Sequence, residues 1–249
     1  MTHTDRRTVL RAATALVAAT ACTPTRPADR PTTPAPPSPS PPPSPHRVPA
    51  QQTHLTHGPR TTGQVALTFH GNGDPRTAEA ILDTAEEHGA HVTVLAVGTW
   101  LDANPKLARR ILDAGHDLGN HTQHHLDINA LPEAEARAEI TACARRLKRL
   151  TGSIGTWFRP SRTARASPLV ARLAREAGYP QVLSYDVDPL DFTDPGPAVL
   201  TRTLTADIRP GSIVSLHFGY PDTVAALPAV LDDLHRRGLT AVTTTELFT

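Results

Sequence analysis

Short apolar runs and longer amphipathic segments alternate from residue 64 to the end of the chain, and this alternation restricts the fold most strongly. The apolar runs predict strands at residues 65–70, 91–97, 117–120, 156–159, 181–186, 212–217 and 240–243. The amphipathic segments predict helices at residues 76–88, 105–114, 132–150, 167–177, 197–208 and 223–237. A glycine, the residue type most common just after the C-terminus of a helix, follows five of the predicted helices. Repeated strand–helix units predict a parallel sheet with right-handed crossovers.

Reactive side chains at the strand ends favour one of two parallel architectures, a barrel or an open doubly wound sheet. They are His70, His121, Arg159, Asp186 with Asp188, and His217. In a parallel barrel all the carboxyl ends of the strands open on one face, where several strands contribute to the active site. An open sheet would concentrate such residues at one switch point. The sequence therefore favours a partly closed α/β barrel.

The N-terminus has the pattern of an export signal. Residues 5–11 (Asp-Arg-Arg-Thr-Val-Leu-Arg) resemble a twin-arginine signal, and the apolar run at 12–21 is too short to span a bilayer. The run ends in Ala-Thr-Ala-Cys, a loose lipobox, so that Cys22 is the expected lipidation site. The alternative is ordinary cleavage near Ala21. We expect an exported protein, held at the outer face of the cell membrane as a lipoprotein or otherwise secreted.

Composition then divides the chain into three parts. Residues 1–22 are the expected signal peptide, residues 23–60 a linker rich in Pro, Ser and Thr, and residues 61–249 the folded domain. Such a linker cannot bury apolar surface and is expected to be extended. The formal net charge of +1 gives no reason to expect nucleic acid or an anionic surface as partner. Two cysteines exclude a disulfide framework, and we expect Cys143 to be buried.

The strongest local pattern is Gly-Asn-His-Thr-Gln-His-His at residues 119–125. His121 and His125 are four residues apart, so a helical turn would place both imidazoles on one side, at a spacing that suits one metal ion. His124 is the alternative partner at a spacing of three. A solvent-exposed histidine pair is the simpler interpretation, but the position after a predicted strand favours a site.

Two further residues at strand ends have side chains that could take part in catalysis. His217 closes an apolar strand, where it is either a core histidine or a proton donor to a leaving amine. Arg159 lies in an apolar strand and requires a carboxylate partner, for which Asp188 or Asp191 is the candidate. This ion pair would belong to the site; the alternative for Arg159 is an ion pair that serves only the fold.

Four of these patterns, in this order, resemble the polysaccharide deacetylases of carbohydrate esterase family 4, from about residue 65 to residue 248. They are His121-Thr122-x-x-His125, Arg159-Pro160, Asp188-x-x-Asp191-Phe192 and Leu216-His217.

The resemblance implies an irregular (β/α)7 barrel and a divalent metal, most often zinc. It implies hydrolysis of N-acetyl or O-acetyl groups on a glycan, with peptidoglycan or another amino-sugar polymer as the expected substrate. In this family Pro160 would form a wall of the groove and Leu216 would lie beside the acetyl methyl group. His217 would be the general acid. Trp157 is a further candidate for the groove, with a place in the core as the alternative.

The first motif departs from the family, which has Thr-Phe-Asp-Asp-Gly-Pro. Residues 68–75 are Thr-Phe-His-Gly-Asn-Gly-Asp-Pro, so that His70 replaces the catalytic base and Gly71 has no ligand side chain. We expect the glycine-rich loop to bring Asp74 back as third ligand, beside the two histidines of the metal motif. His70 would then be the base; in the alternative arrangement Asp74 would be the base and water would complete the ligand set of the metal. The alternatives are a glycan-binding pseudoenzyme and an envelope scaffold without metal.

Overall fold

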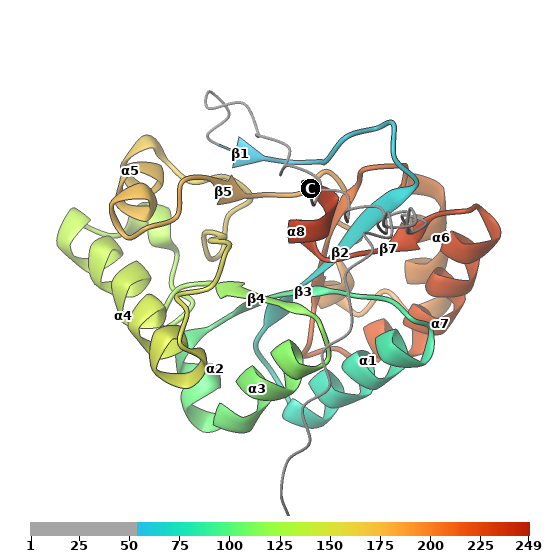
Figure 1. The fold of residues 1–249 in the computed structure, drawn as a ribbon, viewed down its shortest axis with the longest axis horizontal. Coiled ribbons are helices and arrows are strands. Elements are labelled where there is room, and N and C mark those ends of the chain that lie inside the picture. Colours follow the sequence, from blue (N-terminus) through green and yellow to red (C-terminus); the bar gives the residue numbers. More distant parts are fainter. Residues whose placement is uncertain (1–53) are drawn as a thin grey trace, which may run out of the picture. The chain divides into compact units, whose positions relative to one another are not determined.

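The computed structural model describes residues 54–249, and in this part parallel strands are surrounded by helices (Figure 1). The expected signal peptide, Cys22 and most of the expected linker lie outside the described residues, so these remain predictions. No helix among residues 54–249 combines the length and apolar character that a membrane span requires.

Five parallel strands form the main sheet. They are β2 (Gln64–Gly71), β3 (Thr93–Ala96), β4 (Asp117–Asn120), β6 (Ile213–His217) and β7 (Thr240–Ala241). The order is β4-β3-β2-β6, and β7 pairs with the start of β2. The register places His70 of β2 directly opposite His217 of β6.

Single bridges continue this sheet toward a second one. Phe158 pairs with Asn120 on one side and with Val182 of β5 (Val182–Leu183) on the other. Strand β5 pairs in parallel with β1 (His54–Leu55), and Val187 bridges to Val214 of β6. The result is the expected irregular, partly closed barrel. The strand expected at 156–159 is reduced to a single bridging residue, Phe158.

Strand β1 corrects the expected domain boundary at residue 61. Leu55 is buried in the core, and the Ser184 N–H donates to its carbonyl oxygen. The folded domain therefore begins at or before His54, and the linker is shorter than composition alone indicated.

Eight α-helices are found in the described part of the chain. They are α1 (Pro75–Glu87), α2 (Gly98–Ala103), α3 (Pro105–Asp113), α4 (Glu133–Thr151), α5 (Pro168–Glu176), α6 (Pro197–Asp207), α7 (Pro221–Arg236) and α8 (Thr244–Leu247). The six expected helices are confirmed. Helices α2 and α8 were not expected because each is short, although Thr243 and Glu246 form a capping box that announces α8.

The core is mainly apolar, and Cys143 and His116 are two of the titratable side chains buried away from the pocket. Cys143 is fully buried, as expected, and burial raises the pKa of its thiol to about 12. The His116 side chain is likewise buried, and its Nδ1 accepts a hydrogen bond from the Val92 N–H. Burial lowers the pKa of His116 to about 4, although the Glu86 carboxylate opposes this shift.

We predict that His116 makes the fold sensitive to mild acid. The folded-state pKa lies below the ordinary value of 6.5, so the unfolded chain binds the proton more readily, and stability is lost as pH falls from about 6.5 to 4. A shift of this size corresponds to up to about 3 kcal/mol. Urea unfolding across this range should show a smaller decrease for His116→Gln than for the wild type. Equal decreases in both proteins would contradict the prediction.

Candidate metal and catalytic site

Three imidazoles meet at the carboxyl ends of neighbouring strands. His70 lies at the end of β2, His121 directly follows β4, and His125 lies in the next turn. One ring nitrogen from each lies within 4.8 Å of the others, a spacing that can hold a single metal ion. The ring centroid of His121 lies 4.2 Å from the centroid of His70 and 4.9 Å from the centroid of His125.

A tight turn, and not the expected helical turn, brings His121 and His125 together. Thr122 and His125 both have left-handed backbone angles, with φ of 69° and 57°. Two hydrogen bonds stabilise this strained turn. The Asn120 side-chain oxygen accepts the Thr122 N–H, and the Thr122 hydroxyl oxygen accepts the His125 N–H. Strain of this kind is maintained only where surrounding contacts fix it, and it gathers at functional sites.

The hydrogen bonding and the neutral state of these imidazole rings suit metal binding. His121 Nδ1 donates to the Arg159 carbonyl oxygen at 3.0 Å, which leaves the lone pair on Nε2. That Nε2 atom is buried, and no hydrogen-bond partner for it exists among residues 54–249. Burial lowers the pKa of His70 and His121 well below 6.5, so both rings are neutral at neutral pH. Burial, followed by the charge of Arg162, also lowers the pKa of His125. Neutral imidazoles are good donors to zinc, so the residues fit a divalent metal.

The expectation that Asp74 would be the third ligand is wrong for the structure described. The Asp74 side chain is exposed, caps α1 by accepting the Arg76 N–H, and belongs to no metal-binding cluster. The loop before it is closely packed: a Cβ atom on Gly73 would lie 2.5 Å from the Gly219 Cα. His70, and not Asp74, completes the group of three side chains that could hold a metal ion.

His124 is not an alternative ligand, because it contacts a buried carboxylate instead. Glu139 of α4 accepts both the His124 backbone N–H, at 2.8 Å, and its ring Nδ1, at 2.5 Å. The Glu139 side chain is only 8% exposed. Glu139 therefore anchors the centre of the turn that holds His121 and His125.

His217 and Asp191 form a pair beside the three histidines. His217 Nδ1 lies 2.6 Å from an Asp191 carboxylate oxygen, and the other oxygen accepts the His217 N–H and the Thr223 hydroxyl. Asp191 is completely buried, while His217 is partly exposed. The ring of His217 is 4.3 Å from the ring of His70. Asp191 thus fixes the tautomer of His217 and leaves Nε2 free for proton transfer.

Arg159 is buried near these groups but does not form the expected ion pair with Asp188 or Asp191. Its guanidinium donates to the carbonyl oxygens of Leu183 and Ser184 and lies against the Tyr185 ring. Its Nη1 is buried with no partner in the described chain. Burial lowers the pKa of Arg159 to about 10, while the charges of Tyr185 and Asp188 act in the opposite direction. Asp188 is thus its electrostatic neighbour only.

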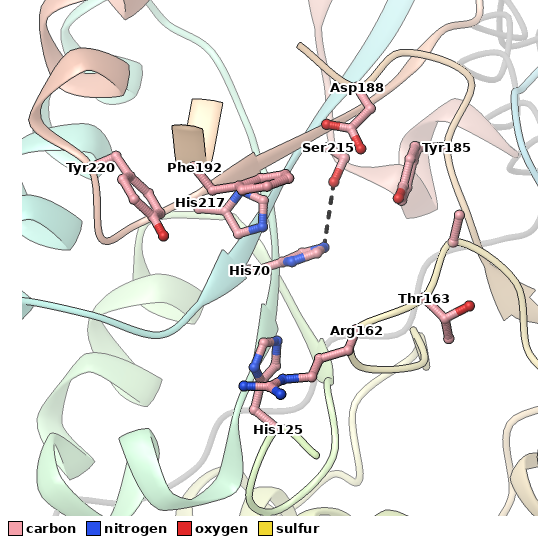
Figure 2. Close-up of a pocket in the computed structure, with 11 residues that line it drawn as sticks. His70, His125, Arg162, Thr163, Tyr185, Asp188, Phe192, Ser215, His217 and Tyr220 are labelled. Atoms are coloured by element: carbon pink, nitrogen blue, oxygen red, sulfur yellow. Dashed lines mark hydrogen bonds between the residues drawn. The ribbon is translucent and has the colours of Figure 1, made fainter. Parts of the chain in front are cut away.

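A pocket of about 440 Å³ opens over this cluster (Figure 2). Figure 2 shows Asp188 and Ser215 on one side of His70 and Arg162 with His125 on the other. The Ser215 hydroxyl is 3.5 Å from His70 Nε2.

Sequence reasoning missed several lining residues, namely Arg162, Thr163, Tyr185, Ser215 and Tyr220. Ser215 could have been found, because it lies two residues before His217 and so on the same face of β6.

Three residues expected at the substrate groove are buried elsewhere. Leu216 and Pro160 are buried and do not line the pocket. Trp157 packs against Phe248 in the core, and its indole N–H donates to Asp117 and Thr245. Asp186, another strand-end carboxylate, forms an ion pair with Arg60 outside the pocket.

Comparison with known proteins agrees with this architecture. Residues 57–182 match the family model described as polysaccharide deacetylase. A peptidoglycan-N-acetylglucosamine deacetylase of Bacillus cereus is 32% identical over 187 residues, which cover 74% of this chain and 87% of the relative. A chitooligosaccharide deacetylase of a Bradyrhizobium species is 31% identical, covering 71% of this chain and 87% of the relative.

Two solved structures extend the comparison. A carbohydrate esterase family 4 pseudoenzyme from Bacillus anthracis has a TM-score of 0.74 at 26% identity, covering 79% of this chain and 69% of the other. A peptidoglycan N-acetylglucosamine deacetylase has a TM-score of 0.75 at 26% identity, covering 80% of this chain and 94% of the other. The chain therefore belongs to the polysaccharide deacetylase family, a class of hydrolases that act on carbon–nitrogen bonds other than peptide bonds.

The position of Asp74 leads to a first prediction for this site. Replacing Asp74 with Ala removes a helix cap and should lower the Tm by about 3 °C. Because its carboxylate lies outside the histidine cluster, metal affinity should not change. Calorimetry and a competition titration with a chromophoric chelator would measure both quantities. Loss of metal binding in this variant would restore Asp74 as a ligand.

Glu139 leads to a second prediction. Glu139→Gln replaces one carboxylate oxygen with an NH2 group, which cannot accept a hydrogen bond from His124. The turn should loosen, and the affinity for Zn²⁺ should fall by about tenfold or more. The exposed Glu135→Gln on the same helix is the matched control. Unchanged affinity together with a lower Tm would show that Glu139 serves the fold and not the site.

Proposed function

We propose that this protein is a metal-dependent deacetylase that removes acetyl groups from the amino sugars of an acetylated polysaccharide. The observation that carries the proposal is the convergence of His70, His121 and His125 beside the His217–Asp191 pair. Of these residues, His70, His125 and His217 line one pocket. A Lewis-acid position and a proton donor are two components that can together catalyse the hydrolysis of an amide.

We propose that the three histidines hold the metal, and that the metal is zinc. The unpartnered Nε2 of His121 and the neutral state of the rings support this ligand set. When bound, the ion would supply polarisation of the acetyl carbonyl and activation of water. His70 would then serve as a ligand, so the expected role of this residue as base is replaced.

The other groups in the pocket divide the proton transfers between them. His217 would donate a proton from Nε2 to the departing amine, since Asp191 holds Nδ1–H and so orients the ring with Nε2 toward the pocket side. Asp188 is the one carboxylate among the described residues that line the pocket, and it would accept a proton from the attacking water.

The substrate class and the location are also proposals. The named relatives act on peptidoglycan or on chitooligosaccharide, which supports an acetylated amino-sugar polymer for this chain. The twin-arginine pattern and Cys22 support export with a lipid anchor, so that a substrate in the cell envelope would lie within reach.

Three variants test the assigned roles. His121→Ala should lose both bound metal and acetate release, because one of three ligands is gone. His217→Ala and Asp188→Asn should keep the metal while turnover falls by about 10²–10⁴-fold, the usual contribution of a general acid or base. Metal content by mass spectrometry and acetate release from acetylated glycan strands would be measured for each.

The pattern of results separates the candidate functions. Full metal content in His121→Ala would contradict the ligand assignment. A wild type that binds zinc and glycan without releasing acetate would be a glycan-binding pseudoenzyme. A wild type that binds no metal at all would agree with a metal-free scaffold, and either result would end the deacetylase proposal.

A further inference from the structure

Arg162 places a positive charge at the rim of the pocket, next to the histidine cluster. It lines the pocket together with His70 and His125, and Figure 2 shows its guanidinium beside the His125 ring. Arg162 is an exposed residue, so water reaches the charge. It takes no part in the ion pairs or side-chain hydrogen bonds found between residues 54 and 249.

The backbone of Arg162 is held in place by the same turn that carries the histidines. Its φ of 59° is left-handed, which is uncommon for a residue with a long side chain. The preceding Ser161 is buried, donates to the Leu126 carbonyl oxygen at 2.5 Å and accepts the Thr122 hydroxyl at 3.1 Å. The start of the Arg162 side chain is therefore fixed relative to His125.

The charges around the pocket leave Arg162 without a counterion. Asp191 is engaged by His217, and Asp188 lies near Arg159 and Tyr185, on the other side of His70 in Figure 2. A divalent ion on the histidines would add further positive charge beside Arg162. Such an arrangement is repulsive until an anion arrives, and a guanidinium binds a carboxylate with two parallel hydrogen bonds.

We propose that Arg162 is a specificity-determining residue that binds a carboxylate of the substrate next to the acetamido group. This inference rests on the proposed function and names its substrate more closely. The fitting substrate is a 2-acetamido sugar with a carboxylate-bearing ether on the adjacent carbon, as in the lactyl-substituted sugar of peptidoglycan strands. Because the two substituents are on neighbouring carbons, an acetamido group at the histidines brings the carboxylate toward Arg162.

Three substrates of equal length test the assignment on the zinc-loaded protein. They are a peptidoglycan glycan strand with free lactyl carboxylates, the same strand with these groups converted to methyl esters, and a neutral chitooligosaccharide. We expect the free-carboxylate strand to have a kcat/KM at least about tenfold above that of its ester. The difference should lie mainly in KM and should shrink at high ionic strength.

Variants connect this preference to the side chain. Arg162→Gln should bring the ratio between the free-carboxylate strand and its ester close to one, while Arg162→Lys should keep part of it. Arg165→Gln, which removes an exposed arginine outside the pocket, is the matched control and should retain the full ratio.

The outcomes keep the two proposals apart. Equal kcat/KM for the free-carboxylate strand and its ester in the wild type would overturn the role of Arg162 and leave the deacetylase proposal intact. An equal loss on all three substrates in Arg162→Gln would also overturn it, because the guanidinium would then act on the acetyl group. Absence of acetate release from all three by the wild type would reject the deacetylase function itself.

Discussion

The register of β2 in the parallel sheet is the constraint on which the site depends. Strand β2 lies between β3 and β6, and the pairing aligns His70 with Leu95 on one side and His217 on the other. Since β3 also aligns with β4, the ends of all four strands reach the same level. A shift of one residue in β2 would move His70 to the opposite face and leave two imidazoles without the third.

Much of this arrangement could be predicted from the sequence because periodicity and strand-end chemistry are local signals. The apolar runs located β2, β4 and β6, and the polar residue at each end identified His121 and His217 as members of one site. The position of Asp74 could not be predicted in this way. Its spacing before Pro75 is also the signature of a helix cap, and the choice between cap and ligand depends on packing between distant loops.

The hydrogen-bond partners of the buried charged residues could not be predicted from local sequence patterns either. Arg159 and Asp191 are both fully buried and carry opposite charges, so the sequence predicts an ion pair between them. In the fold, Asp191 receives three hydrogen bonds from His217 and Thr223, whereas backbone carbonyl oxygens receive those of Arg159. A carbonyl oxygen is available at every residue, so sequence alone gives no indication that an arginine will use one.

The contact between Gly73 and Gly219 joins the loops that follow β2 and β6 backbone to backbone, and the indole N–H of Trp100 donates to the Gly73 carbonyl oxygen. No side chain separates the two main chains, so atomic radii limit how closely the loops after His70 and His217 approach each other. This close approach lies beside the hydrogen bond that the Phe218 N–H donates to the His70 carbonyl oxygen, so the two loops are held at contact distance. A methyl group at residue 73 would act as a wedge and spread the two strand ends apart.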